Sequence, residues 1–288
     1  MRSVHAFNLA VERVQTALFW AGAALGAAVL AAVVGYLGYG AMAFLSRHDA
    51  WAVVGGMSWD PVRGRFGMAP FWIGSAVVAA LGLAIAVPLG LGIGIWAGQG
   101  LVPALRQRVG VYLTVLSAVP SVVWGWWGLV VVVPALRQLT GGTGYSLAAG
   151  GVVLGLMVLP TFAQLAVQAV AAVPAAWVEG SLALGATMDQ TLLRLVLPAA
   201  KAGLRRALWV ALARALGETV AVQMVVGGFP GRFFGVWAPG ATIPSQILTE
   251  LPLLPPGTPG HGALEVMALL LVVAMTAVTQ WAGRERRQ

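Results

Sequence analysis

The sequence predicts an all-α integral membrane protein with six transmembrane helices. Of the 288 residues, 59% are hydrophobic and only 9% are charged, a balance that a soluble domain does not have. Five long stretches contain no charged residue: 14–46, 66–105, 109–136, 138–178 and 266–283. Because a hydrocarbon core about 30 Å thick is crossed by about 20 helical residues, each stretch is long enough to span a membrane.

The six spans are expected to build one transmembrane domain, residues 1–288. We expect the helices at about 15–45, 70–98, 110–136, 146–172, 202–228 and 262–283. The first span is too long for the hydrophobic region of a signal peptide and has no clear cleavage site. We therefore expect it to remain as an anchor helix.

Proline interrupts the second, third and fourth spans, at Pro88, Pro120 and Pro160. Pro120 is expected to break the backbone hydrogen bonds near the middle of the membrane. Such a break is tolerated only where protein or a water-filled cavity satisfies the freed groups. The following segment, 122–129, is rich in tryptophan, so it either lines such a cavity or anchors the helix at the interface.

Basic residues are divided unevenly between the two sides of the membrane. With the N-terminus in the cytoplasm, 11 basic residues face the cytoplasm: Arg2, Arg13, Arg106, Arg108, Arg194, Lys201, Arg205, Arg206, Arg284, Arg286 and Arg287. Five face outward: Arg47, Arg63, Arg65, Arg137 and Arg232. The positive-inside rule therefore places both termini and the loop 173–201 in the cytoplasm.

Several classes of function are excluded by the composition. The chain has no cysteine, which excludes disulfides and thiolate metal sites. Its three histidines are widely spread and none is expected within a span, so we expect no metal site and no cofactor. The net charge of +8 is explained by membrane topology, not by binding of nucleic acid. No phosphate-binding P-loop motif occurs, so we expect no ATP hydrolysis by this chain and no enzymatic activity.

The loop 173–201 has the pattern of a docking element. Gly185 follows Glu179 by 6 residues, and the pair Leu197–Pro198 begins 12 residues after Gly185. The pattern comprises Glu179, Gly180, Ser181, Gly185, Leu197 and Pro198. Pro174 and Gly185 predict a short helix from about Ala175, a turn at Gly185 that a bulkier residue would crowd, and a second short helix. The spacing resembles the EAA loop of ABC-transporter permeases, with Gly180 and Ser181 replacing two alanines. The alternative is an ordinary amphipathic loop helix.

Two ionisable residues, Arg214 and Glu218, lie inside the fifth span. Charged groups are costly there and are functional candidates by default. In a continuous helix the two residues share one face, about 6 Å apart along the axis. A guanidinium group offers several planar donors to a tetrahedral oxyanion, and Glu218 would partly neutralise it when no anion is bound. The alternative is a structural ion pair.

Two longer segments sharpen the resemblance. They are PSVVWGWWGL at 120–129 and RALGETVAVQMVVG at 214–227, and both are similar to segments of the high-affinity phosphate permeases of the PstC family. The segment WDPVRGRFG at 59–67 resembles the first outer loop of that family. The resemblance implies a type I ABC importer permease fold and a substrate path that includes Arg214, Glu218 and Thr219.

The same resemblance implies a set of partners. They are a PstA-like second permease, a PstB-like ATPase dimer below the membrane and a PstS-like phosphate-binding protein outside it. The loop 173–201 would then couple to the ATPase. The outer loops, about 46–69 and 229–261, would receive the binding protein, the alternative being a solvated cap over the helix ends.

Three other functions remain open at this point. The first is a permease for another oxyanion, such as sulfate or molybdate, since arginine does not separate tetrahedral anions by charge alone. The second is a membrane subunit that senses phosphate without transporting it. The third is a secondary transporter, which would leave the EAA-like loop without a purpose.

Overall fold

The computed structural model describes residues 2–99, 103–228 and 235–284. Arg232, Arg286 and Arg287, which entered the charge count, lie outside the described residues. The described chain forms a helical bundle with one small hairpin. In chain order its elements are α1 (Arg2–Leu45), α2 (Ala50–Gly55), β1 (Trp59–Asp60), η1 (Pro61–Arg63), β2 (Arg65–Phe66), α3 (Ala69–Gln99), α4 (Pro103–Ser117), α5 (Ser121–Trp127), η2 (Gly128–Val132), α6 (Val133–Thr140), α7 (Leu147–Ala171), α8 (Ala175–Ala183), α9 (Met188–Thr191), η3 (Leu192–Val196), α10 (Leu197–Gly217), α11 (Val220–Val226), α12 (Ile243–Glu250) and α13 (Pro259–Arg284).

The helices have the lengths and apolar composition of membrane spans. Among the described residues, five are long and apolar enough: Glu12–Leu45, Ala69–Gln99, Ser121–Thr140, Leu147–Ala171 and Pro259–Trp281. A sixth span results if the bent pair Met188–Gly217 and Val220–Val226 is counted as one crossing. The prediction of an all-helical membrane protein is confirmed, and the number of six spans depends on this bent pair.

The third predicted span, 110–136, is wrong in its boundaries. The chain forms α4, breaks at 118–120 and then forms the spanning helix Ser121–Thr140. Pro120 therefore precedes the spanning helix and does not lie in its middle. At this position a proline costs little, because the first N–H groups of a helix have no intrahelical partner.

Two other prolines distort the helices that contain them. Pro134 follows η2, and Pro198 follows η3, and both of these segments are π-helical. A proline inside a helix has no N–H to donate and clashes with the carbonyl group four residues earlier. A π-helical turn just before the proline accommodates this conflict without ending the helix.

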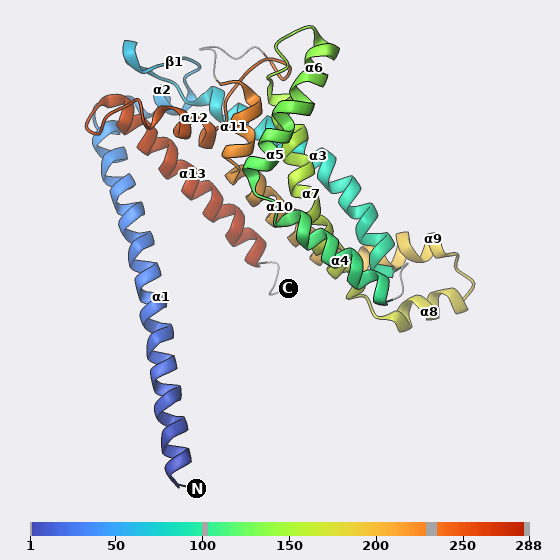
Figure 1. Cartoon of the computed structure of the whole chain (residues 1–288). Helices are drawn as coiled ribbons and strands as arrows, with labels where there is room; N and C mark the ends of the chain where they lie inside the picture. Colours follow the sequence, from blue (N-terminus) through green and yellow to red (C-terminus); the bar gives the residue numbers. More distant parts are fainter. Residues whose placement is uncertain (1, 100–102, 229–234, 285–288) are drawn as a thin grey trace.

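The centre of the bundle is the contact between α3 and α7, which run in the same direction (Figure 1). On α3, every fourth residue from Gly82 to Gly98 is glycine or alanine. A Cβ at Gly94 would lie 2.7 Å from the Cβ of Ala166, and a Cβ at Gly98 would lie 2.6 Å from Cγ1 of Val170. The small residues therefore allow the two helices to approach closely, as is usual between helices in membranes.

Helix α1 stands largely apart from this bundle. It contacts α13 near its C-terminal end and extends away from the other helices toward its N-terminus (Figure 1). The side chains along most of its apolar length are exposed in the isolated chain, among them Phe19, Trp20 and Leu30. Its exposed surface is suited to lipid or to another membrane subunit.

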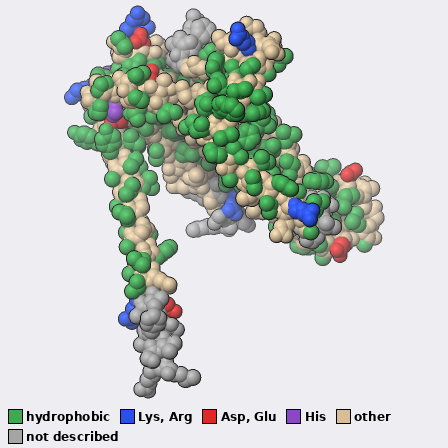
Figure 2. Space-filling model, viewed as in Figure 1, with side chains coloured by type: hydrophobic (Ala, Val, Ile, Leu, Met, Phe, Trp, Pro, Cys, Tyr) green, Lys and Arg blue, Asp and Glu red, His purple; other side chains and the backbone are tan. Residues whose placement is uncertain are grey.

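The bundle has two ends, which we call the α12 end and the α8 end. The α12 end carries α2, the β1–β2 hairpin and α12, and the α8 end carries α8 and α9 (Figure 1). Figure 2 shows a broad hydrophobic surface along the middle of the visible face, with Lys, Arg, Asp and Glu gathered toward the two ends. This distribution is the one expected of a protein that crosses a membrane between these ends.

Candidate functional site

The fifth predicted span, 202–228, is broken next to its charged residues. Helix α10 ends at Gly217, and α11 begins at Val220 and is bent by 60° relative to the preceding helix. Glu218 has an extended backbone, with φ of −71° and ψ of 125°. Irregular backbone at membrane depth occurs where protein or a water-filled cavity satisfies its polar groups. The break therefore marks α10–α11 as the candidate functional site within the bundle.

The break overturns the expectation that Arg214 and Glu218 share one face of a continuous helix. Glu218 lies beyond the last residue of α10, and its Oε1 accepts a hydrogen bond from the backbone N–H of Ala221 at 3.1 Å. Thr219 donates its hydroxyl to the carbonyl of Gly217 at 3.2 Å. Both side chains thus satisfy backbone groups that the broken helix exposes. They link the end of α10 to the start of α11.

Arg214 is half-buried in the last turn of α10, and it forms no ion pair with any residue that the structure describes. Its neighbours Ala211 and Ala215 are buried against the core. A cation without a partner at membrane depth costs about 2.5 kcal/mol or more. The expected neutralisation of Arg214 by Glu218 is therefore wrong for this structure, and Arg214 keeps its donors available.

Glu218 borders a narrow gap between α3, α10 and the start of α12. The gap is too narrow to hold a water molecule, and it is lined in part by Ser75 and Thr242. Ser75 accepts a hydrogen bond from the backbone N–H of Ile243 at 2.9 Å, and so fixes α12 to α3. Arg214 is not among the residues that line this gap. The structure therefore brings Glu218 together with polar groups of the α12 end, which the sequence did not predict.

Two further polar atoms near the break are buried without a hydrogen-bond partner. They are Oε1 of Gln223 in α11 and Nε1 of Trp124 in α5, two helices that contact each other. A buried polar group without a partner costs about 1–3 kcal/mol. Trp124 lies in the segment 120–129 and Gln223 in the segment 214–227, but the sequence pattern indicated no role for Gln223. The signal that points to it is a lone amide in an otherwise apolar stretch.

The loop 173–201 has the form predicted for it. Helix α8 begins at Ala175 after Pro174, Gly185 has a positive φ of 89°, and α9 begins at Met188. The hydroxyl groups of Ser181 and Thr191 lie 2.9 Å apart and join the two short helices. The prediction of two short helices joined by a turn at Gly185 is confirmed.

Glycine is needed at position 185 because of its backbone conformation, and the expectation that a bulkier residue would be crowded there is wrong. A Cβ at Gly185 would meet nothing within 4 Å, so a larger residue would not be crowded. The constraint is instead the positive φ, which L-residues other than glycine adopt only at a cost. Gly180 also has open space around it, and it lies in the helical part of α8. The absence of an alanine at position 180 thus has no steric cause in this structure.

The α8–α9 loop presents apolar side chains outside the spans. Val178 is buried against the ends of α7 and α10, whereas Trp177 is 55% exposed and Leu184 is 91% exposed. Glu179 and Gly180 are exposed beside them. Leu197 is half-buried and Pro198 exposed where η3 passes into α10. A rigid loop that exposes large apolar side chains is suited to bind another protein.

The two loops of the α12 end are joined by a buried polar contact. The indole Nε1 of Trp59 donates to both carboxylate oxygens of Glu250 at 2.9 Å, and Gln246 donates to Oε1 at 2.7 Å. Burial raises the pKa of the Glu250 carboxyl above its ordinary value of 4.5, and the two hydrogen bonds partly oppose this shift. This contact explains why a tryptophan begins the segment 59–67, because it fixes the hairpin to α12.

One ionisable pair in a span was missed by the sequence analysis. His261 and Glu265 lie in the first turns of α13, with Nε2 of His261 3.7 Å from Oε1 of Glu265. The expectation that no histidine lies within a span is therefore wrong, because the apolar helix begins at Pro259. Among the described residues, no group of three or more His, Cys, Asp or Glu side chains is placed to hold a metal ion.

Residues 90–284 match a protein family described as "Binding-protein-dependent transport system inner membrane component". The chain is 40% identical over 182 residues to the probable ABC transporter permease protein YqgH of Bacillus subtilis, covering 59% of this chain and 56% of that protein. It is 30% identical over 214 residues to the phosphate transport system permease protein PstC of Mesorhizobium japonicum, covering 67% of this chain and 65% of that protein. The chain thus spans less than two thirds of the length of these two relatives.

The fold is similar to that of solved transporter structures. A chain of the MetNI methionine ABC transporter in an inward-facing conformation matches with a TM-score of 0.54 and 22% sequence identity, over 78% of this chain and 94% of that chain. A chain of an amino acid ABC transporter matches with a TM-score of 0.52 and 19% identity, over 77% of this chain and 93% of that chain. At these identities the likeness concerns the arrangement of helices alone.

Proposed function

The chain belongs to the family of binding-protein-dependent transport system inner membrane components, and on this basis we propose that it forms half of the translocation path of an ATP-driven phosphate importer. It is a permease subunit of an ABC importer. The choice of phosphate rests on one observation above the others, the similarity to the PstC proteins over two thirds of the chain. Members of this family are membrane transport components, and in our proposal ATP is hydrolysed by a partner chain.

Arg214 is the residue that we assign to the anion. Its guanidinium group has no ion-pair partner among the described residues and lies beside a break in the spanning helix. Guanidinium donors in a fixed plane fit the oxygens of a tetrahedral anion. A second permease would complete the path, because a single chain presents Arg214 from one side only.

Glu218 and Thr219 have a different role from the one that a shared helical face suggests. Their side chains hold the backbone of the break, so that the donors of Arg214 keep a fixed position relative to α11. Phosphate near neutral pH retains at least one acidic proton, whereas sulfate retains none. A carboxylate that accepts this proton therefore favours phosphate over sulfate. We assign this selection to the second oxygen of Glu218.

The α8–α9 loop is the proposed contact with the ATPase dimer. It is held to the spans by Val178 and by the continuous path through η3 into α10, the helix that carries Arg214. A movement of the loop is thus transmitted along one helix to the substrate site. The residues assigned to coupling are Glu179, Gly180, Ser181, Gly185, Leu197 and Pro198.

The α12 end is the proposed contact with an extracytoplasmic phosphate-binding protein. The hairpin and α12 form one ordered surface there, since Trp59 and Gln246 both bind Glu250. With this assignment the α8 end lies on the cytoplasmic side of a bacterial inner membrane. The same orientation follows from the larger number of basic residues in the loops of that side.

A competition experiment tests the choice of cargo. The chain is reconstituted in vesicles with its second permease, its ATPase and a loaded binding protein, and uptake of labelled phosphate is measured with a hundredfold excess of unlabelled sulfate or molybdate. We expect uptake to persist under both conditions and to be abolished by unlabelled phosphate. Strong competition by sulfate or molybdate would assign the chain to another oxyanion. ATP hydrolysis without any uptake would favour a sensing subunit.

A further inference from the structure

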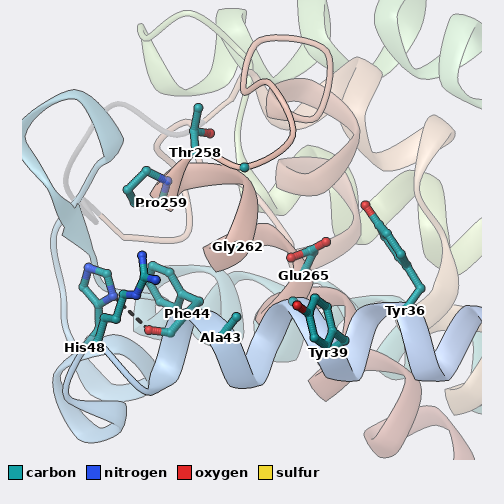
Figure 3. A pocket seen from close by; sticks show the side chains of 12 residues that line it. Tyr36, Tyr39, Ala43, Phe44, His48, Thr258, Pro259, Gly262 and Glu265 are labelled. Atoms are coloured by element: carbon teal, nitrogen blue, oxygen red, sulfur yellow. Dashed lines mark hydrogen bonds between the residues drawn. The ribbon is translucent and has the colours of Figure 1, made fainter.

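A cavity at the α12 end opens between α1 and α13, far along the chain from the broken helix. It has a volume of about 310 Å³. The residues that matter for its chemistry are Tyr36, Tyr39, Arg47, His48, Thr258 and Glu265. Figure 3 shows Glu265 between the two helices, flanked by Tyr36 and Tyr39. The transport mechanism proposed above uses none of these residues.

The carboxylate of Glu265 lies where α1 comes close to α13. A Cβ at Gly40 would collide with this carboxyl group, so position 40 leaves the room that it occupies. The side chain of Glu265 is 12% exposed. Nδ1 of His261 lies 2.9 Å from the carbonyl of Leu254, which can only accept, so Nδ1 carries the hydrogen. The other ring nitrogen is 3.7 Å from Glu265, longer than a hydrogen bond.

The rim of the same cavity carries the opposite charge. Arg47 is exposed, and the described part of the chain provides it with no carboxylate within ion-pair distance. The ring of His48 stacks on Phe44 and is held by the carbonyl of Phe44 at 3.0 Å. A recessed anion and an exposed cation in one cavity are complementary to a zwitterion, with an amine beside Glu265 and an anionic group beside Arg47.

The position of the cavity in the membrane indicates which kind of zwitterion can reach it. It opens sideways between two membrane helices at their interfacial end, and tyrosines are typical of that depth. Tyr36 and Tyr39 are 59% and 79% exposed. Val33 and Val29 continue the same face of α1 by about one and two turns toward the middle of the membrane, and both are exposed. Beyond the charged cavity, α1 thus presents an exposed apolar face against which acyl chains can pack.

We propose that this cavity binds the headgroup of a phospholipid with a primary amine, phosphatidylethanolamine. The ammonium group lies against Glu265 and the faces of the tyrosine rings, and the phosphate lies against Arg47. The lipid then fills the contact between α1 and α13 and holds α1 beside the bundle. Free phosphate does not fit, because the recessed carboxylate of Glu265 would repel it.

Lipid retention tests this site. The assembled complex is reconstituted in vesicles with equal parts of phosphatidylethanolamine, phosphatidylcholine and phosphatidylglycerol, extracted in mild detergent, and its bound lipids are quantified by mass spectrometry. We expect wild type to retain phosphatidylethanolamine preferentially. Glu265→Gln should lower this preference roughly tenfold, because it removes a hydrogen bond to a charged group. Arg47→Gln should lower retention of all three lipids, since each has a phosphate.

Two controls keep the test decisive. Arg63→Gln changes an exposed arginine at the same end that pairs with Asp60, and it should leave lipid retention unchanged. If Glu265→Gln does not assemble, Tyr39→Leu replaces it, with an expected loss of roughly threefold in preference. Equal preference in the Glu265 variant and wild type would overturn the proposal. So would a photo-reactive residue at position 39 that cross-links to the second permease and not to lipid.

Discussion

The interpretation of the broken helix depends on the contacts of two single residues. Arg214 and Glu218 are four positions apart, a spacing that in an unbroken helix makes an ion pair. The structure separates them, because Glu218 leaves the helix and binds the N–H of Ala221. Arg214 therefore has no ion-pair partner among the described residues. Residue spacing predicted an ion pair, but the contacts of the two residues depend on a helix end that the spacing cannot reveal.

Glu250 gives the α12 end a dependence on pH. Burial raises its pKa above 4.5, so the folded state binds the proton more tightly than the unfolded state does. The contribution of Glu250 is then most favourable at low pH, and it is lost as the pH rises from about 4.5 through the higher pKa of the folded state. The side chain of Glu250 is partly exposed to solvent, which weakens the effect.

The variant Glu250→Gln should lose this dependence, because an amide stays neutral at every pH. We expect the unfolding temperature of the variant to rise relative to wild type as the pH is increased from about 4.5 to neutrality. Thermal unfolding of the purified protein across this range measures the difference. Glu12→Gln, which changes an exposed carboxylate on α1, serves as the control and should show a constant difference. A constant difference for the Glu250 variant as well would disprove the assignment.

The helices themselves were largely predictable from the sequence, and their breaks were not. Long apolar stretches located the spans, because every spanning helix must present apolar side chains to lipid. The end of α10 carries only a weak signal, Gly217, while apolar residues continue on both sides. The start of α13 was placed too late, at about residue 262, so His261 was left outside the span. Glu265, four residues further, was the signal that this helix also carries a charge.

The α8–α9 loop allows a matched comparison between two glycines. Gly185→Ala forces a residue with a Cβ to keep a φ of 89°, at an expected cost of about 1–2 kcal/mol. Gly180→Ala adds a methyl group to a helical position with open space, and should be neutral or stabilising by up to about 1 kcal/mol. ATP hydrolysed per phosphate transported should rise in the first variant. It should stay unchanged in the second, because alanine is the residue that the EAA pattern has at position 180.

Both variants are compared by uptake and hydrolysis in the same reconstituted complex. Identical coupling in the two variants and wild type would remove the α8–α9 loop from the coupling mechanism. Impaired coupling in the Gly180 variant alone would point to a steric contact with the ATPase and not to the turn at Gly185.

The whole molecule places its three candidate surfaces at separate positions along the membrane normal. The α8–α9 loop lies at one end, the β1–β2 hairpin with α12 lies at the other, and the junction of α10 and α11 lies between them (Figure 1). Helix α10 runs without interruption from the α8–α9 loop side of the bundle to the break before α11. This arrangement fits an importer that receives its cargo at the α12 end and is driven from the α8 end. We propose that Arg214 binds the anion on its way from the α12 end to the α8 end.

Phosphate uptake by the Arg214→Gln variant tests this claim most directly. The variant is reconstituted with the second permease, the ATPase and the binding protein, and its assembly and ATP hydrolysis are checked first. We predict that the complex assembles and that uptake of labelled phosphate falls to less than roughly a tenth of wild type. Arg108→Gln, an exposed arginine on α4, should transport normally. Wild-type uptake by the assembled Arg214→Gln complex would contradict the account.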